Sequence, residues 1–277
     1  MRCCAVALLI LLSSLVVPPW ARRVIAEPAS ETLVFAGCDA NLPLMRLLAQ
    51  AFVQKRPGID ISLVAVGSTN GVALAAAGAV QIGLVSRALR PSETGLGLAF
   101  RPFARTAVVL AADLAVPDTV LTASDLLGHY SGTKRQWASG LNLVLLTREE
   151  GDSSIASLRE NLPGFAEAYA TGASRGHWIV LYNESAMHEA LLTVPFALGL
   201  SDLGTIAIER LPIRALSIDG VASTLENVSS GRYPFTKTLG LVWRPDALPE
   251  AARAFVEFVR TDEAMEILTS HGYLPVP

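Results

Sequence analysis

The residues with the clearest chemical potential are the five small or polar ones of the turn Gly67-Ser68-Thr69-Asn70-Gly71. The turn follows an alternating, strand-like run, Ile59–Val66, and precedes a run of small residues with helical character, Val72–Ala79. Backbone N–H groups at the start of such a helix point outward together, and the helix dipole adds positive potential there. The stretch therefore predicts a seat for an oxyanion, although an ordinary turn between a strand and a helix has the same composition.

Two other turns between predicted strands and helices carry similar small polar residues. Gly37–Asn41 follows the first predicted strand, Thr32–Ala36, and Arg148–Ser154 follows a strand in the middle of the chain. Ser86-Arg87 follows a further predicted strand, Gln81–Val85, and adds a positive charge. Ligands bind at the carboxyl ends of parallel strands, so these turns are expected to surround one anion-binding cleft.

The start of the chain resembles a secretory leader. Arg2 precedes an apolar run that ends at Val17, and Val24-Ile25-Ala26 offers a cleavage site. The run is shorter than the roughly 20 residues that a membrane-spanning helix needs. The order therefore predicts a signal peptide over residues 1–26 and export to the periplasm.

Composition and charge exclude several classes of function. The 277 residues are 51% hydrophobic and 17% charged, which argues against disorder. Without residues 1–26 the chain has 19 basic and 25 acidic residues, a net charge of −6 that gives no support for nucleic-acid binding. Cys38 is then the single cysteine, so no internal disulfide can form. We expect no metal or other cofactor, because metal-ligand spacing is absent among the histidines His129, His177, His188 and His271.

The order of the predicted elements is typical of an α/β protein. The first part reads strand, helix, strand, helix, strand, which favours a mainly parallel sheet, and a second α/β unit follows in the middle of the chain. The predicted strands are Thr32–Ala36, Ile59–Val66, Gln81–Val85, Thr106–Ala112, Leu141–Leu146, Trp178–Tyr182, Phe196–Leu200 and Tyr233–Trp243. The predicted helices are Leu42–Lys55, Val72–Ala79, Ser124–Tyr130 with Ser124 as its cap, Ile155–Asn161, Ser185–Thr193, Leu248–Arg260 and Asp262–Ser270.

In this order, the motifs resemble those of the phosphate-binding proteins of bacterial ABC importers, within the type II periplasmic binding protein fold. Each motif is short, but together they span nearly all of the chain after residue 26. The segments that carry the resemblance are Gly67–Gly71, Ile82–Arg87, Leu121–Trp137, Arg148–Ser154, Gly231–Phe235 and Gly272–Pro275.

The resemblance implies a two-lobe α/β fold, each lobe a mainly parallel sheet flanked by helices, joined by two hinge strands. Lobe 1 would comprise residues 27–107 plus 237–277, and lobe 2 residues 108–236. The implied function is capture of inorganic phosphate in the cleft between the lobes for an ABC permease, by a monomer that catalyses no reaction and contacts only the membrane complex. Two alternatives stay open: another oxyanion or small phosphorylated or carboxylated ligand, and a stand-alone sensor or interaction module with the same fold.

The same resemblance implies a ligand set drawn from both lobes. Asn41 could equally be a plain helix cap, and the Arg148–Ser154 turn could be a solvent loop before a capped helix. The implied ligand residues are Asn41, Ser68, Thr69, Asn70, Gly71, Ser86 and Arg87 from lobe 1, and Arg148, Asp152, Ser153 and Ser154 from lobe 2.

Two residues depart from the family pattern. Arg87 stands where some members carry an Asp that accepts a proton from the bound phosphate, and arginine is only a donor; it could instead pair with Glu93. Asp152 stands where the family usually has Ser, and a carboxylate about 4 Å from an oxyanion is repelled by roughly 4 kcal/mol at an effective dielectric of about 20. We therefore expect Asp152 to cap the next helix, although it could also pair with Arg148 or accept the hydrogen of hydrogen phosphate.

Overall fold

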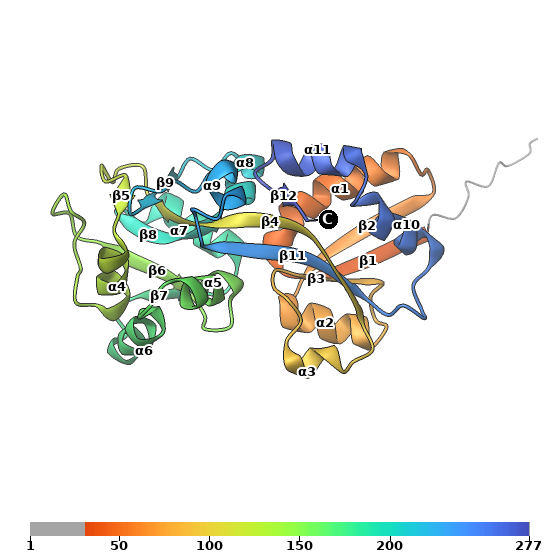
Figure 1. The fold of residues 1–277 in the computed structure, drawn as a ribbon, viewed down its shortest axis with the longest axis horizontal. Coiled ribbons are helices and arrows are strands. Elements are labelled where there is room, and N and C mark those ends of the chain that lie inside the picture. Colours follow the sequence, from red (N-terminus) through yellow and green to blue (C-terminus); the bar gives the residue numbers. More distant parts are fainter. Residues whose placement is uncertain (1–30, 277) are drawn as a thin grey trace, which may run out of the picture.

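The computed structural model describes residues 31–276, in which strands and helices alternate along most of the chain (Figure 1). The predicted signal peptide, residues 1–26, lies outside the described residues. Within the described range, every helix is too short or too polar to cross a membrane.

One long sheet passes through the whole molecule in the order β2-β1-β3-β11-β4-β8-β6-β7. At one end β1 pairs in parallel with β2 and β3, and at the other β6 pairs in parallel with β7 and β8. Between them β11 and β4 run antiparallel to their neighbours. The strands are β1 (Glu31–Gly37), β2 (Ile59–Ala65), β3 (Ile82–Val85), β4 (Ala99–Ala112), β6 (Val144–Arg148), β7 (Ile179–Leu181), β8 (Ala197–Asp202) and β11 (Thr236–Trp243), with the short strands β5 (Val120–Leu121), β9 (Arg214–Ala215), β10 (Ser217–Ile218) and β12 (Leu274–Pro275).

Helices cover both faces of this sheet. Figure 1 shows α1, α10 and α11 on one side of β1 and β3, and α2 with α3 on the other. The helices are α1 (Leu42–Gln54), preceded by the 3-10 turn η2 (Asp39–Asn41), α2 (Ser68–Ala76), α3 (Pro91–Thr94), α4 (Ala123–Ser131), α5 (Ser153–Asn161), α6 (Phe165–Arg175), α7 (Glu184–Thr193), α8 (Leu203–Glu209), α9 (Leu225–Ser229), α10 (Glu250–Phe258) and α11 (Asp262–Ser270).

Two large hydrophobic cores lie on either side of the middle of β4. In the first core, the ring centroid of Phe255 lies 4.9 Å from that of Phe35 and 5.2 Å from that of Phe52. In the second core, the centroid of Tyr130 lies 4.7 Å from that of Phe165. Along β4, Phe103 and Ala104 belong to the first core and residues 107–112 to the second. The strand therefore connects two separately packed halves, which we call the first and second half after their cores.

The structure corrects several predicted boundaries. β4 begins at Ala99 rather than at Thr106, because a bulge opposite Leu239 and Gly240 accommodates the Arg-Pro segment that interrupts the apolar run. The cap of α4 is Thr122, whose hydroxyl accepts the Asp125 N–H at 3.0 Å, and not Ser124. Helices α6 and α8 were not predicted at all.

The position of α2 is the correction that bears on the site. The helix begins at Ser68 rather than at Val72, so the polar turn forms its first turn. Gly71 lies so close to β1 that a Cβ there would be 2.8 Å from the carbonyl oxygen of Ala36 and 2.8 Å from the Cα of Gly37. Only a glycine allows this approach of helix and strand.

Gly71→Ala is therefore expected to push α2 away from β1 and to lower the free energy of unfolding by about 1–3 kcal/mol, as overpacking does. Urea denaturation measures the loss. Gly95→Ala is the matched control, because that residue has a φ of −80° and no atom within 4 Å of an added Cβ. Equal stability of the two variants would contradict the tight packing of α2.

Candidate functional site

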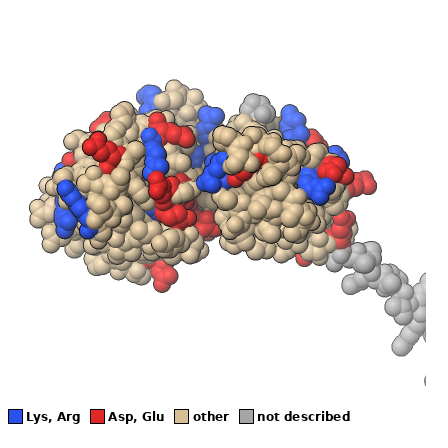
Figure 2. Space-filling model, turned by 90° about the horizontal axis from the view of Figure 1, so that it is seen from below, with Lys and Arg blue, Asp and Glu red and all other residues tan. Residues whose placement is uncertain are grey.

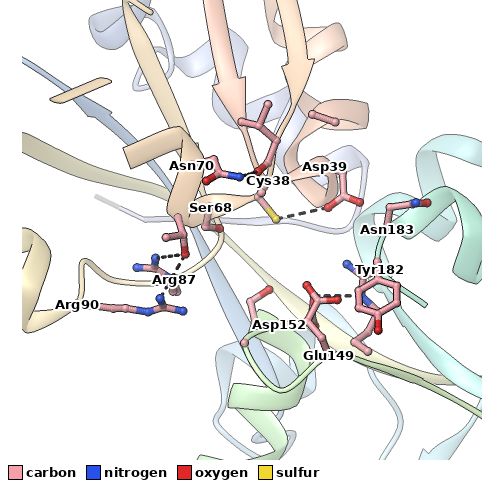
Figure 3. Close-up of a pocket in the computed structure, with 17 residues that line it drawn as sticks. Cys38, Asp39, Ser68, Asn70, Arg87, Arg90, Glu149, Asp152, Tyr182 and Asn183 are labelled. Atoms are coloured by element: carbon pink, nitrogen blue, oxygen red, sulfur yellow. Dashed lines mark hydrogen bonds and ion pairs between the residues drawn. The ribbon is translucent and has the colours of Figure 1, made fainter. Parts of the chain in front are cut away.

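A cleft of about 460 Å³ lies where the turns after β1, β2, β3, β6 and β7 meet (Figure 3). Charged residues of both signs gather at the groove between the two halves (Figure 2). The lining residues are Cys38, Asp39, Ala65, Val66, Gly67, Ser68, Thr69, Asn70, Arg87, Arg90, Arg148, Glu149, Gly151, Asp152, Ser153, Tyr182 and Asn183.

The start of α2 presents two hydroxyl donors to this cleft. The Ser68 Oγ accepts the backbone N–H of Ser86 at 3.2 Å. The Thr69 Oγ1 accepts from Arg87 Nη2 and from Arg90 Nη1, each at 3.3 Å. Because both oxygens act as acceptors there, each hydroxyl can direct its own proton elsewhere. The first N–H groups of a helix also lack partners within it, so the start of α2 is rich in donors.

The backbone that leads into α2 is held by β1. The N–H groups of Val66 and Gly67 both donate to the carbonyl of Gly37, at 2.8 and 2.9 Å. Gly67 has a φ of +79°, which favours glycine and lets the chain turn from β2 into the helix. The Asn70 Nδ2 donates back to the carbonyl of Val66 at 2.8 Å. Asn70 thus stabilises the turn, and its amide oxygen and the second hydrogen of Nδ2 remain without a partner within residues 31–276.

Arg87 forms the ion pair that the sequence had left as its alternative role. Its Nη1 and Nη2 each lie 2.7 Å from one carboxylate oxygen of Glu93, and Nη1 also donates to the Ala88 carbonyl at 2.9 Å. The hydrogen bond from Arg87 lowers the pKa of Glu93. The charge of Arg87 is therefore neutralised beside the cleft, whereas Arg90, which was not predicted, makes no ion pair within residues 31–276.

Arg148 and Asp152 form a buried pair on the opposite wall. The Arg148 Nε lies 3.1 Å from Asp152 Oδ2, and Asp152 Oδ1 accepts the Ser154 N–H at 2.8 Å as the N-cap of α5. Asp152 thus caps the helix, as expected, and also pairs with Arg148. Ser153, the first residue of α5, lies beside them on the cleft wall.

One nitrogen of Arg148 has no partner. The side chain is only 5% exposed, and its Nη1 makes no hydrogen bond with any residue that the structure describes. Burial acts to lower the pKa of Arg148, but the carboxylates of Asp152, Glu184 and Asp39 outweigh it and raise the pKa, so the guanidinium stays charged. A buried, charged and unsatisfied donor that lines a cleft is costly unless a ligand completes it.

Four residues of the predicted ligand set do not line the cleft: Asn41, Gly71, Ser86 and Ser154. Asn41 donates from Nδ2 to the Val85 carbonyl at 3.1 Å and accepts the Ser86 hydroxyl at 2.8 Å. Gly71 packs against β1, and the Ser154 N–H is taken by Asp152. These residues hold the turns together behind the wall.

The sequence reasoning missed Asp39, Glu149, Tyr182 and Asn183, all of which line the cleft. Asp39 lies in a turn that was recognised, but its carboxylate was not considered. Its Oδ2 accepts the N–H of Glu184, at the start of α7, at 2.6 Å, so it links the two halves. The Glu149 Oε2 is buried with no hydrogen-bond partner in the described chain, and burial raises the pKa of this carboxyl.

A cluster of buried charges lies next to the cleft, at the junction of the halves. The Lys237 Nζ, from β11, lies 3.1 Å from Asp202 Oδ2 and 3.4 Å from Glu184 Oε1. Burial raises the pKa of Glu184 to about 7 although Lys237 opposes the change. Burial lowers the pKa of His188, whose Nε2 is 3.5 Å from the other oxygen of Glu184.

The raised pKa of Glu184 predicts a pH-dependent contribution to stability. The folded protein holds this proton more tightly than the unfolded chain, so folding stability falls as the pH rises from about 4.5 to about 7. Glu184→Gln, which mimics the neutral form, should gain on the wild type by roughly 1–3 kcal/mol across this window. Urea denaturation of both proteins at several pH values measures the difference between their free energies of unfolding. His188 has the opposite pH effect, but it is present in both proteins, so its contribution largely cancels. A constant difference would show that burial does not perturb Glu184.

A family model described as the PBP superfamily domain matches residues 24–263. The chain belongs to the PBP superfamily. Among curated relatives, the phosphate-binding protein PstS of Bacillus subtilis is 25% identical over 258 residues, which cover 90% of this chain and 82% of that protein.

Solved structures of PBP-like proteins share the fold. A candidate phosphate ABC transporter substrate-binding protein from Clostridium perfringens, solved with bound phosphate, superposes with a TM-score of 0.80 at 22% identity, over 89% of this chain and all of that one. An ABC-type phosphate transport receptor from Vibrio cholerae gives a TM-score of 0.65 at 21% identity, with 89% and 100% covered. The predicted two-lobe α/β fold of type II periplasmic binding proteins is thereby confirmed.

Proposed function

We propose that this PBP-superfamily protein is an extracytoplasmic solute-binding protein that captures inorganic phosphate in the cleft for uptake by an ABC transporter. The observation that carries the proposal is the buried, charged Arg148, whose Nη1 has no partner within residues 31–276. Arginine suits a tetrahedral oxyanion because its planar fork can offer two parallel N–H donors. The B. subtilis protein is a phosphate-binding protein, and the C. perfringens and V. cholerae proteins are described as parts of phosphate transporters, which supports the same cargo.

The two halves would hold the anion from opposite sides. Ser68 and Thr69 offer hydroxyl protons and the N–H groups of the first turn of α2, which together suit three or four anion oxygens. Arg148 and Ser153 lie across the cleft. Arg87, which is paired with Glu93, and Asp152, which caps α5, would act mainly by fixing Thr69 and Arg148 in place.

Lobe closure would follow from the two cores. We assign lobe 1 to residues 27–107 plus 237–277 and lobe 2 to residues 108–236, because the first and second cores fall on these two sides. β4 and β11 would be the hinge strands, since within residues 31–276 they connect the sheet of one half to that of the other. Cargo that contacts both walls favours the closed arrangement.

The predicted signal peptide and the family indicate where the protein acts and what it contacts. A signal peptide over residues 1–26 would place the protein in the periplasm as a monomer that contacts an ABC permease and no nucleic acid. The alternative of a stand-alone sensor would use the same cleft and differ only in the partner.

Isothermal titration calorimetry with phosphate, sulfate, molybdate and phosphonates tests the cargo. We expect phosphate to bind, and Arg148→Lys, which keeps the charge but loses the fork, to weaken binding by about tenfold or more. Ser68→Ala should weaken it as well, because one hydroxyl donor is lost.

Matched controls lie outside the cleft. Arg101→Lys alters an arginine that pairs with Glu257, and Ser62→Ala alters an exposed serine of β2; both should bind as the wild type does. Absence of phosphate binding at about millimolar concentration between about pH 6 and pH 8 would overturn the proposed cargo. Unchanged binding by both cleft variants would misplace the site.

A further inference from the structure

The cleft carries as many carboxylates as guanidinium groups. The carboxylates of its lining are those of Asp39, Glu149 and Asp152, and the guanidinium groups are those of Arg87, Arg90 and Arg148. Glu93 in addition neutralises Arg87 from just outside the lining. The formal charge of the lining is therefore zero, which is a poor environment for a free, doubly charged hydrogen phosphate.

The two acidic residues that were not predicted differ from Asp152 in what they contact. Asp152 is paired with Arg148 and caps α5. No cation lies within ion-pair distance of Asp39 or Glu149 in the part of the chain that the structure describes, and the Glu149 Oε2 is buried there without any hydrogen-bond partner. A buried carboxylate oxygen without a donor is costly, just as the unpartnered Nη1 of Arg148 is. At the cleft wall, one buried acceptor of Glu149 and one buried donor of Arg148 are thus without partners among the described residues.

Two of the three arginines, Arg87 and Arg90, lie apart from the acidic residues, whereas Arg148 lies beside Asp152. Figure 3 shows Ser68, Arg87 and Arg90 at one end, and Asp39, Glu149 and Tyr182 toward the other. The Tyr182 side chain is 71% exposed, so its ring is open to a ligand. Aromatic rings attract cations over their faces. The volume of about 460 Å³ lies within the range of about 300–1,000 Å³ of pockets that take whole organic molecules.

We propose that the preferred cargo is a phosphate ester or phosphonate that carries a primary amine on a short alkyl chain. The phosphoryl group binds at Ser68, Thr69 and Arg148, and the ammonium group donates to Glu149 and faces Asp39. This proposal rests on the oxyanion site of the proposed function and changes only what is attached to the anion. The ammonium group of such a ligand can donate a hydrogen bond to Glu149, and its positive charge offsets the negative charge of the cleft carboxylates.

Hydrogen phosphate itself satisfies the acidic end less well. It has one hydrogen, which can be given to one carboxylate oxygen, and its remaining charge is still repelled by the other carboxylates. An ammonium group offers three donors and a full positive charge. The acidic end therefore discriminates in favour of the amine-bearing ligand.

Calorimetry with three probes tests the proposal: inorganic phosphate, ethyl phosphate and 2-aminoethyl phosphate. The two esters differ only in the amine. We expect the wild type to bind 2-aminoethyl phosphate at least about tenfold more tightly than ethyl phosphate, and Glu149→Gln to reduce this preference to less than about threefold. Glu150→Gln is the matched control, because Glu150 is the next residue, does not line the cleft and pairs with Arg159; it should keep the full preference.

The outcomes separate this inference from the proposed function. Equal affinity of the wild type for the two esters would overturn the inference, and phosphate binding would still support the proposed cargo. A preference that survives Glu149→Gln would also overturn it, because the amine would then be recognised elsewhere. Failure of all three probes to bind would overturn the oxyanion site, and both proposals with it. Binding of 2-aminoethyl phosphate but not of inorganic phosphate would support the inference and replace the cargo.

Discussion

The ion pair between Arg148 and Asp152 is the interaction on which the rest of the cleft depends. Arg148 is the last residue of β6, and Asp152 starts α5, so the pair fixes the end of a strand to the beginning of a helix. Asp152 accepts from the helix with one oxygen and from the guanidinium with the other, and Tyr169 donates to the Arg148 carbonyl at 2.8 Å. The guanidinium is thereby held in one orientation by its Nε, and neither Nη1 nor Nη2 has a hydrogen-bond partner among the described residues. The carboxylate of Asp152, which by itself would repel an anion, therefore orients the guanidinium group of Arg148, which attracts one.

The opposite wall of the cleft also contains a pair of an arginine and a carboxylate, Arg87 and Glu93. There Glu93 accepts two hydrogen bonds from Arg87, and Arg87 also donates to the Thr69 hydroxyl, which lines the cleft beside it. In each wall a charged pair holds a donor in place: Arg87 and Glu93 beside Thr69, and Asp152 beside the guanidinium of Arg148. The cleft therefore relies on local donors, which suits a chain whose net charge is negative.

Much of the fold could be predicted from the sequence because its signals are local. The apolar runs of β1 and β3, the alternation in β2 and the apolar spacing of α1 identified the parallel unit. The sequence also indicated α2, but placed its start at Val72 instead of Ser68. The first part of β4 could not be predicted, because Arg101 and Pro102 break its apolar pattern and only pairing with β11 makes it a strand. Asp39, Glu149 and Tyr182 were missed for a related reason. They come from separate turns, and their proximity exists only once both halves have folded. The sequence offered capping of α5 and pairing with Arg148 as separate roles for Asp152, and the structure shows both. A sequence does not show that one carboxylate accepts from two donors at once.

The contact between Asp39 and α7 has a consequence for the cycle of loading and release. The start of α7 is itself a place that attracts anions, and a carboxylate from the other half of the protein already occupies it, at 2.6 Å from the Glu184 N–H. A hydrogen bond to a charged group contributes on the order of 1–3 kcal/mol, and this one exists only while the halves are together. Asp39 therefore favours the arrangement in which the two halves are together. Any separation of the halves must break this hydrogen bond, so part of the cost of opening the cleft comes from the contact between Asp39 and the start of α7.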